Sequence, residues 1–361
     1  MELQEYLRQH SLEELCNTYS IKANRHQKYP HLVCLKYSQI ESPMGEKIVQ
    51  QCRGIILDSQ ADWQIISYPY DKFFNYGEGN AATIDWSHAQ VYEKLDGSLM
   101  VLYFYDGKWQ VQSSGTPDAS GEVNDFNITF AALFWKVWEE LGYQLPQDIE
   151  HCFMFELMTP YNRIVVPQKD KNLVLHGVRN INTLQEIDPH IFSNKYGWNI
   201  VKSYSLSNWE EVINASRNLD PMDSEGYIIC DRAFHRVKVK SPQYVAISHL
   251  REGFSSRRML EIVVTNEGEE FLSYFPEWTD LYNKIKTRYQ SFITEVEETY
   301  HQYQHIEVQK DFALAIKHLP YSGILFSLRA GKINSVREAL RHATVQKLEE
   351  LLGIDYINLG L

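Results

Sequence analysis

The chain has 361 residues, which is enough for two domains with sizeable cores. Its hydrophobic fraction of 44% and charged fraction of 23% are those of an ordinary globular protein in water. The net charge of −12 excludes a general basic coat for nucleic acid, because such affinity comes from neutralising phosphates, but it leaves room for a local basic cleft.

Residues 1–5 have none of the features of a signal peptide, and no apolar run is long enough to span a bilayer. The five cysteines are scattered without a CxxC pair, and most lie inside apolar runs. This pattern predicts reduced core thiols in a cytoplasmic protein rather than disulfides or a zinc site.

Strand patterns dominate the first part of the chain. Residues 2–19 predict a helix that restarts near Ser11, because Ser11 and Glu14 have the spacing of a capping box. The expected strands are 32–38, 52–58 and 63–68, and residues 71–79 form a predicted loop with aromatic residues and two glycines.

A lysine, Lys94, lies where a strand-like run ends, and the Asp96-Gly97 turn and the run 99–105 follow. The pattern predicts a β-hairpin with Lys94 at its mouth. Taken alone, these residues are better explained by a solvated lysine beside a common turn than by a covalent nucleophile. The remaining residues have to decide between the two interpretations.

Further elements follow in order. An amphipathic helix is predicted over 125–142, strands over 152–157 and 172–178, a helix over 208–219, and an antiparallel pair over 225–230 and 235–240. After residue 242 the pattern turns helical, with expected helices at 277–305, 308–318, 321–329, 335–342 and 345–352 and a doubtful strand at 262–264. The predicted fold class is therefore α+β, with an antiparallel-sheet domain over 1–242 and a helical domain over 243–361.

Charged residues interrupt three of the strand patterns. Glu156 lies in an otherwise apolar strand, Glu225 directly precedes another, and Lys238 and Lys240 alternate with valines, so that both lysines leave one face. Each residue alone is more simply a charge that faces water at a sheet edge. A buried charge is costly unless it is paired, so together these residues predict one polar cavity.

Two carboxylates and three lysines suit an anionic, metal-bound ligand. A lysine amine that has lost its proton can attack the α-phosphorus of a nucleotide, and Lys238, Lys240 and a metal ion would favour the neutral amine of Lys94. Carboxylates such as that of Glu156 would hold Mg²⁺. The chain has no GxxxxGK[ST] sequence, which excludes a P-loop NTPase.

Four segments in this order resemble the motifs of the covalent nucleotidyltransferases, the superfamily of ligases and capping enzymes. Lys94-Leu95-Asp96-Gly97 resembles its KxDG motif. The other three are Phe153-Met154-Phe155-Glu156, Ser224-Glu225-Gly226-Tyr227-Ile228 and Val237-Lys238-Val239-Lys240. Cys52-Arg53-Gly54-Ile55-Ile56, Lys72-Phe73-Phe74-Asn75 and Pro160-Tyr161-Asn162-Arg163-Ile164-Val165 are more specifically similar to the phage-type RNA ligase 1 family, and this resemblance covers about residues 37–244.

The resemblance implies an ATP-grasp-like ligase domain and a three-step reaction that needs ATP and Mg²⁺ or Mn²⁺. AMP passes from ATP to Lys94, then to the 5′-phosphate of an RNA, and a 3′-hydroxyl end finally displaces it. The implied partner is RNA with 5′-phosphate and 3′-hydroxyl ends, with tRNA as one candidate, and the implied setting is RNA repair by a monomer in the cytoplasm. The helical domain is expected to select the RNA.

The resemblance also implies roles for individual residues. Lys94 is the catalytic nucleophile, and Glu156 and Glu225 are the expected metal ligands. Adenine would lie between His176 and Ile228, with its amine against the backbone of Glu93. The remaining expected nucleotide-binding residues are Tyr37, Arg53, Lys72, Lys238 and Lys240, together with Glu156 and Glu225, and Tyr244 is a lesser candidate near the nucleotide.

One segment departs from the family pattern. Members carry a basic residue about twenty positions after the nucleophile, whereas residues 113–118 here are rich in hydroxyls and contain no lysine or arginine. Hydroxyls and backbone amides would take over the phosphate contacts, or else one step is slower or the RNA docks differently.

Two other functions remain open from the sequence. A DNA ligase or capping enzyme would normally continue into a strand-rich OB domain, where this chain turns helical. A non-catalytic protein that binds RNA ends would have lost Lys94, Lys238 or Lys240, and all three are present.

Overall fold

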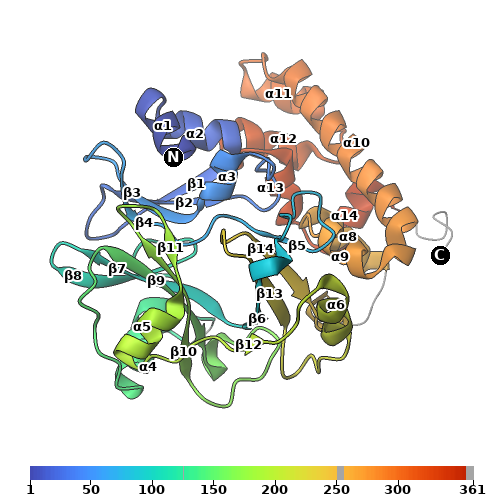
Figure 1. The fold of residues 1–361 in the computed structure, drawn as a ribbon. Helices are drawn as coiled ribbons and strands as arrows, with labels where there is room; N and C mark the ends of the chain where they lie inside the picture. Colours follow the sequence, from blue (N-terminus) through green and yellow to red (C-terminus); the bar gives the residue numbers. More distant parts are fainter. Residues whose placement is uncertain (125, 250–255, 355–361) are drawn as a thin grey trace. The chain divides into compact units, whose positions relative to one another are not determined.

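The computed structural model describes residues 1–124, 126–249 and 256–354, and it divides into two compact units, Met1–Ser248 and His249–Leu361 (Figure 1). The sequence placed a boundary after residue 242. Each unit has its own hydrophobic clusters. Among the residues described, no helix combines the length and the apolar character needed to cross a membrane.

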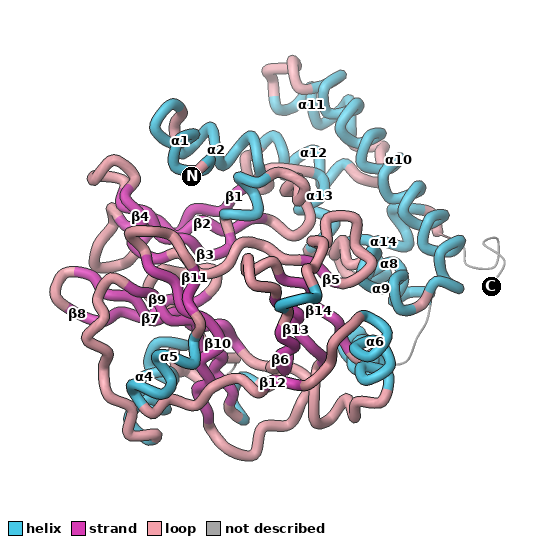
Figure 2. The backbone as a smooth tube through the Cα atoms, viewed as in Figure 1, coloured by secondary structure: helices cyan, strands magenta, loops and turns pink. Residues whose placement is uncertain are grey.

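Three sheets build the first unit, and they are antiparallel except for one short strand pair (Figure 2). Sheet A has the order β1-β2-β3-β4, sheet B the order β12-β6-β13-β14-β5, and sheet C the order β11-β10-β9-β7-β8. The strands of sheet A are β1 (Ile21–Arg25), β2 (Leu32–Tyr37), β3 (Arg53–Asp58) and β4 (Gln64–Ser67). Those of sheet B are β5 (Phe74–Asn75), β6 (Gln90–Lys94), β12 (Ser203–Tyr204), β13 (Gly226–Cys230) and β14 (Arg236–Lys240). Those of sheet C are β7 (Ser98–Tyr105), β8 (Lys108–Ser113), β9 (His151–Met158), β10 (Asn172–Asn180) and β11 (Glu186–Ile187).

Sheet C is apolar on both faces, and β9 shows why. Phe153, Phe155 and Leu157 pack with the buried face of α4 (Phe130–Glu140), while Cys152 and Met154 pack with strands of sheet A. All five side chains are fully buried. Burying a residue such as Phe contributes roughly 1.5–3 kcal/mol, so this strand is a rigid support for the one carboxylate it carries.

The hairpin predicted around Asp96-Gly97 is wrong. Strand β6 pairs with β12 and β13 in sheet B, whereas β7 pairs with β8 and β9 in sheet C, so the chain crosses between sheets at this turn (Figure 2). The reason is burial, because Asp96 is only 4% exposed and a hairpin turn of this type would be solvated. The later pair of β13 with β14 is antiparallel as predicted, and β7 also pairs with β8 in antiparallel fashion.

Several short elements have no clear sequence signal and were not predicted: β1, β5, β11, β12, α3 (Lys47–Gln51), α5 (Pro189–Tyr196) and the 3-10 helices η1 (Trp86–His88) and η2 (Pro160–Asn162).

The predicted helix over 125–142 is shorter, since Thr129 caps α4, and residue 125 lies outside the described residues. The restart at Ser11 is confirmed, because its side chain accepts a hydrogen bond from the Glu14 amide between α1 (Glu2–Gln9) and α2 (Leu12–Tyr19). The predicted helix over 208–219 is α6 (Trp209–Arg217), capped by Asn208.

Helices follow β14 in the described part of the chain. They are α7 (Pro242–His249), α8 (Ser256–Val264), α9 (Gly268–Tyr274), η3 (Pro276–Trp278), α10 (Thr279–Tyr303), α11 (Gln309–Ile316), α12 (Ser322–Arg329), α13 (Val336–Arg341) and α14 (Val345–Leu352). The doubtful strand at 262–264 is wrong, because this run belongs to α8. Its side chains, with Met259 and Leu260, enter the main core of the second unit, and tertiary packing of this kind overrides β propensity.

Candidate active site

Lys94 is the last residue of β6 and lies between two pockets of the first unit. The first pocket has a volume of about 530 Å³, and the second has a volume of about 800 Å³. Both are lined by Glu93, Lys94, Leu95 and Val201. The lysine side chain is 20% exposed, so it is accessible to a ligand and still constrained by its surroundings.

Asp96 fixes the turn that follows Lys94. One carboxylate oxygen accepts hydrogen bonds from the amides of Val165 and Val166, at 2.9 and 2.6 Å, and the other accepts one from the Tyr244 hydroxyl at 2.8 Å. Charge-assisted bonds of this kind are stronger than neutral ones. The Tyr244 side chain therefore holds the turn that follows Lys94. It does not line either of the two pockets.

Gly97 allows the close approach of the turn to sheet C. A Cβ atom there would lie 2.5 Å from the Leu157 carbonyl oxygen and 3.0 Å from Cγ of Glu156. Only glycine fits without displacing the backbone of β9. The KxDG sequence thus joins the end of sheet B to the strand that carries Glu156.

Glu225 forms an ion pair with the candidate nucleophile. Lys94, Gly226 and Lys240 lie in one row across β6, β13 and β14, and Glu225 directly precedes that row. Its carboxylate lies 2.6 Å from Lys94 Nζ and 3.5 Å from Lys240 Nζ. Gly226 has a φ of 153°, and a Cβ there would lie 2.2 Å from the Val239 carbonyl oxygen, which explains the glycine after Glu225.

Cationic side chains from two sheets line the first pocket, and they include Arg53, Lys94, Lys238 and Lys240. On β14 the intervening Val237 and Val239 are only 1% and 2% exposed, so the predicted alternation of the two lysines is confirmed. Arg53 is placed by a β-bulge at Gly54, which has a φ of 91°. Its Nη1 atom is buried and has no hydrogen-bond partner in the structure.

Sheet C supplies Glu156 and His176 to the same pocket. His176 is the extra residue of a bulge, because the β9–β10 register shifts between Leu175 and Gly177. Its Nε2 lies 3.5 Å from Glu156 Oε2, and its ring stacks on Tyr70 at 5.7 Å with an interplanar angle of 26°. Bulges re-aim side chains in this way next to functional sites.

Ile228 of β13 also lines the first pocket, as do Tyr70, Phe73 and Tyr92. His176 and Ile228, which the sequence placed on either side of an adenine, therefore line the same pocket. The amide of Glu93 donates to the Lys202 carbonyl at 2.9 Å.

Tyr37 and Lys72 are not among the residues that line the first pocket, and lie beside Arg53. Lys72 Nζ is 5.4 Å from the Tyr37 ring centroid. Burial alone would raise the pKa of Tyr37, but Lys72, Arg53 and Lys36 together outweigh it and lower that pKa. Burial also lowers the pKa of Lys36, a residue of this cationic group that the sequence did not single out.

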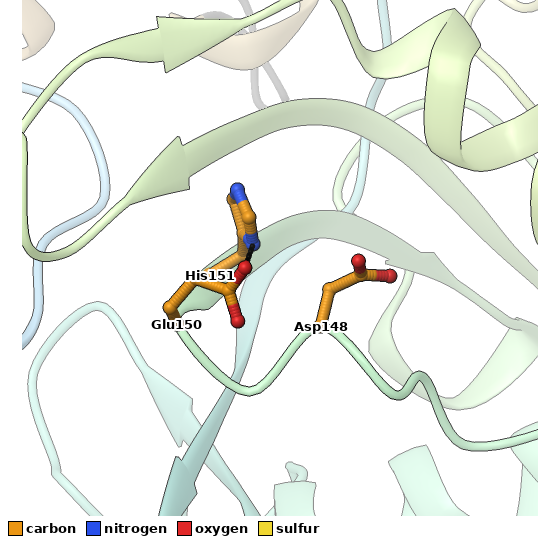
Figure 3. Close-up of side chains that lie close together, drawn as sticks. All are labelled: Asp148, Glu150 and His151. Carbon is orange, nitrogen blue, oxygen red and sulfur yellow. Dashed lines mark ion pairs between the residues drawn. The ribbon is translucent and has the colours of Figure 1, made fainter.

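Glu156 and Glu225 line different pockets, so the structure does not bring the two predicted metal ligands together as one set. Each still offers carboxylate oxygens of the kind that Mg²⁺ and Mn²⁺ prefer, next to the cavity that Lys94 faces. In the part of the chain that is described, three potential ligands gather only at Asp148, Glu150 and His151 (Figure 3).

That cluster is already engaged. Both oxygens of Asp148 accept hydrogen bonds from Lys195, at 2.9 and 2.7 Å, and Tyr196 donates another. His151 faces Glu150 across 3.6 Å, the ion pair drawn in Figure 3. A cation there would have to displace the Lys195 ammonium.

The hydroxyl-rich loop lies apart from the two pockets around Lys94. Ser113 Oγ and Thr116 Oγ1 are 2.8 Å apart, and Asn24 donates to the Gly115 carbonyl at 2.7 Å. The two hydroxyls are thus engaged with each other. Neither pocket has a lining residue from 113–116.

Besides Lys36, sequence reasoning missed four residues around the site: Tyr70, Asp96, Glu186 and Arg236. Asp96 is part of the KxDG segment, and its position two residues after the nucleophile was a usable signal. Arg236 alternates with Lys238 and Lys240 on β14, and this period was available as a signal. Tyr70 and Glu186 have no such signal, because only the tertiary fold brings Tyr70 to the pocket wall and Glu186 into contact with Arg236.

Comparison with known proteins adds the family context. A family model described as RNA ligase matches residues 51–244. An RNA ligase of Rhodothermus phage RM378 is 23% identical over 376 residues, covering 83% of this chain and 85% of the phage protein. A putative bifunctional polynucleotide kinase/RNA ligase of Autographa californica nuclear polyhedrosis virus is 27% identical, and the match covers 73% of this chain but only 40% of that protein.

Solved ligases resemble parts of the fold. An archaeal ATP-dependent RNA ligase has a TM-score of 0.45 at 14% identity, with 75% of this chain and 74% of that chain covered. A mutant of the Naegleria gruberi RNA ligase with ATP and Mn has a TM-score of 0.34 at 15% identity, and the match spans about half of that chain (51%) and 45% of this one.

Proposed function

The chain belongs to the RNA ligase family whose model matches residues 51–244, and we propose that it joins RNA ends with ATP through a covalent AMP on Lys94. One observation carries the assignment of Lys94. Its amine lies 2.6 Å from Glu225 at the edge of a pocket that also receives Arg53, Lys238 and Lys240. This is the arrangement that an amine needs to meet a polyphosphate.

The proposed reaction has three displacements at phosphorus. Lys94 Nζ loses a proton and attacks the α-phosphorus of ATP, the bond to the β-phosphate oxygen breaks, and pyrophosphate leaves. An oxygen of the RNA 5′-phosphate then attacks the same phosphorus, and the P–N bond to Lys94 breaks. The 3′-hydroxyl of a second end finally loses its proton, attacks the RNA phosphorus and releases AMP.

Glu225 is placed to hold the Lys94 amine and to accept its proton before the first step. As long as the amine of Lys94 is an ammonium, its lone pair is not available for attack. The Glu225 carboxylate holds that ammonium in place and is close enough to accept its proton, with Lys240 on its other side. A lysine with no carboxylate partner would have to release its proton directly to solvent.

ATP suits the first pocket in chemistry. The cations Arg53, Lys238 and Lys240 would hold phosphates, and the unpartnered Nη1 of Arg53 offers a ready donor. Tyr37 and Lys72, beside Arg53, would extend this positive wall toward the leaving pyrophosphate. The base would lie between His176 and Ile228, with its amine at the Glu93 carbonyl.

Glu156 and Glu225 are the proposed holders of Mg²⁺ or Mn²⁺, and such an ion would neutralise charge on the phosphates. The two carboxylates reach the cavity from sheets C and B. They are proposed to act on opposite sides of Lys94, since they line different pockets.

The substrate is proposed to be RNA with 5′-phosphate and 3′-hydroxyl ends, in the repair of broken RNA, with tRNA as one candidate. Residues 1–242 would form an ATP-grasp-like adenylyltransferase domain, and the helical domain over 243–361 would select the RNA. The described residues after β14 form helices, which favours this reading over a DNA ligase or capping enzyme with an OB domain. We further propose a cytoplasmic monomer, and the five free cysteines fit a reducing compartment.

An end-joining assay tests the proposed function. A single-stranded RNA with a 5′-phosphate and a 3′-hydroxyl is incubated with Mg²⁺ and ATP, GTP or NAD in parallel. We expect circular RNA with ATP alone, and much less product from a DNA strand of the same sequence. Joining that is equally efficient with GTP or NAD, or that prefers DNA, would contradict the proposal.

A further inference from the structure

Two arginines and a glutamate form a buried cluster behind the first pocket. Arg179 belongs to β10, Glu186 to β11 and Arg236 to β14, and their side chains are only 9–11% exposed. None of the roles described above uses this cluster.

Glu186 links sheets B and C through its side chain. Its Oε1 accepts hydrogen bonds from Arg179 Nη2 at 2.9 Å and Arg236 Nη1 at 3.0 Å, and its Oε2 accepts one from Arg236 Nη2 at 2.6 Å. Strands β10 and β11 lie in sheet C and β14 lies in sheet B. The bidentate pair therefore sets the distance between two sheets that supply opposite walls of the first pocket.

Arg179 anchors the other end of the cluster. Its Nε donates to the Pro69 carbonyl at 3.0 Å and its Nη1 to the Leu184 carbonyl at 2.6 Å. The guanidinium carbon also lies 4.3 Å from the Tyr68 ring centroid. With three separate contacts, Arg179 leaves Glu186 little freedom to move.

Arg236 is held as a cation by its ion pair with Glu186. Burial by itself would lower the pKa of Arg236, but the adjacent Glu186 carboxylate outweighs burial and raises it. Arg236 therefore stays a cation whose bidentate donors point at Glu186. Its guanidinium carbon lies 4.4 Å from the centroid of the Tyr70 ring.

Tyr70 connects Arg236 with His176, because its ring contacts both side chains. Its ring stacks on His176, and its hydroxyl lies 2.9 Å from both Nδ1 and the carbonyl oxygen of His176. Tyr70 packs so closely against Gly177 that a Cβ atom there would lie 1.8 Å from the Tyr70 hydroxyl oxygen. Tyr70, His176 and Arg236 all line the first pocket.

We propose that Glu186 is a positioning residue for the binding of ATP, acting through Arg236 and Tyr70 on His176. This inference rests on the proposed function of the pocket. A buried ion pair is by itself weak evidence for function. Here, however, the contacts run without a gap from Glu186 to the side chain that would face the base, and they tie it to the strand that carries Lys238 and Lys240.

The test is Glu186→Gln, which keeps the shape of the side chain and removes its charge. Self-adenylylation of the full chain is measured over a range of ATP concentrations, together with the thermal melting temperature. We expect KM for ATP to rise about tenfold or more and kcat to change far less, because a misplaced wall weakens ground-state binding of the nucleotide. A merely structural role would lower the melting temperature and leave KM unchanged.

Two further variants keep the test decisive. Tyr70→Phe removes only the hydroxyl that meets His176 and should reproduce the rise in KM even if Glu186→Gln fails to fold. Glu140→Gln removes a comparable lysine pair, with Lys171, on the surface and should leave KM as in the wild type.

The outcomes separate the inference from the function beneath it. A wild-type chain that takes no AMP from ATP would overturn the proposed function, and the inference with it. If the wild type is charged normally and both Glu186→Gln and Tyr70→Phe keep the wild-type KM, the inference alone is overturned. If Glu186→Gln does not fold, an unchanged KM in Tyr70→Phe is sufficient to overturn it.

Discussion

At the scale of single residues, the surroundings of Lys94 explain why an ordinary-looking turn can hold a nucleophile. Asp96 and Gly97 act on opposite sides of the chain, one by accepting hydrogen bonds and the other by lacking a side chain. Glu225 then holds the amine itself. Each of these contributions is open to a separate substitution.

Asp96→Asn should destabilise the chain and slow charging of Lys94. The amide offers one acceptor oxygen in place of two, so at least one of the three donors that meet Asp96 is left buried and unpaired. Losing a hydrogen bond to a charged group costs about 1.5–3 kcal/mol. Tyr244→Phe removes one donor and leaves the carboxylate intact, so chemical denaturation should show a smaller loss for it than for Asp96→Asn.

Gly97→Ala should slow the charging of Lys94 with AMP much more than Gly115→Ala does. The new methyl group would push on the Leu157 carbonyl and on Glu156, and overpacking of this kind costs about 1–3 kcal/mol. Gly115→Ala is the matched control, because a Cβ there meets no atom within 4 Å. Equal charging rates for the two variants would refute the role assigned to Gly97.

At the scale of elements, the site depends on irregularities in the strands. The bulge at Gly54 aims Arg53, the bulge at His176 aims that ring, and the crossing at Gly97 joins sheets B and C. The regular strands around them are set by hydrophobic alternation, which a single sequence displays. The bulges are set by contacts from other strands, which it does not.

This difference explains what could be predicted. The lysine spacing on β14, the lone carboxylate in β9 and the helical part after residue 242 follow from local periodicity. The hairpin failed because Asp-Gly predicts a solvated turn, while the donors that bury Asp96 lie about 70 and 148 residues further along the chain. The Glu186 cluster was invisible for the same reason, since Glu186 has a local pattern no different from that of a surface residue.

The loop after β8 should respond to acid through Asp118. Burial would raise the pKa of Asp118, but hydrogen bonds from Ser120 and from the amide of Gln27 outweigh it and hold that pKa below its usual value. A pKa lowered on folding stabilises the fold above the usual aspartate pKa, and this contribution is lost as the pH falls through the folded-state value.

Asp118→Asn should therefore be less stable than the wild type at neutral pH. The difference in unfolding free energy should shrink as the pH falls below about 4, the usual aspartate range. Denaturant titrations at several pH values check this. A difference that stays constant with pH would show that the charge of Asp118 does not hold the loop.

At the scale of the whole molecule, chemistry and RNA choice are proposed to belong to different parts of the chain. Each of the two compact units has its own core, and the two pockets around Lys94 are lined by residues of the first unit. A chain cut after residue 248 should still take AMP from ATP. It should lose the preference among RNA substrates that the full chain shows, as measured by joining rates on several RNAs. A truncated chain with an unchanged preference would remove that role from the helical unit.

The most direct test of the central claim is to find the AMP. The full chain is incubated with Mg²⁺ and ATP, its intact mass is measured, and the modified peptide is sequenced by mass spectrometry. We expect one AMP per chain on Lys94, none on Lys94→Ala, and continued sealing of a pre-adenylated RNA by that variant. AMP on another residue, or a Lys94→Ala chain that is charged like the wild type, would contradict it.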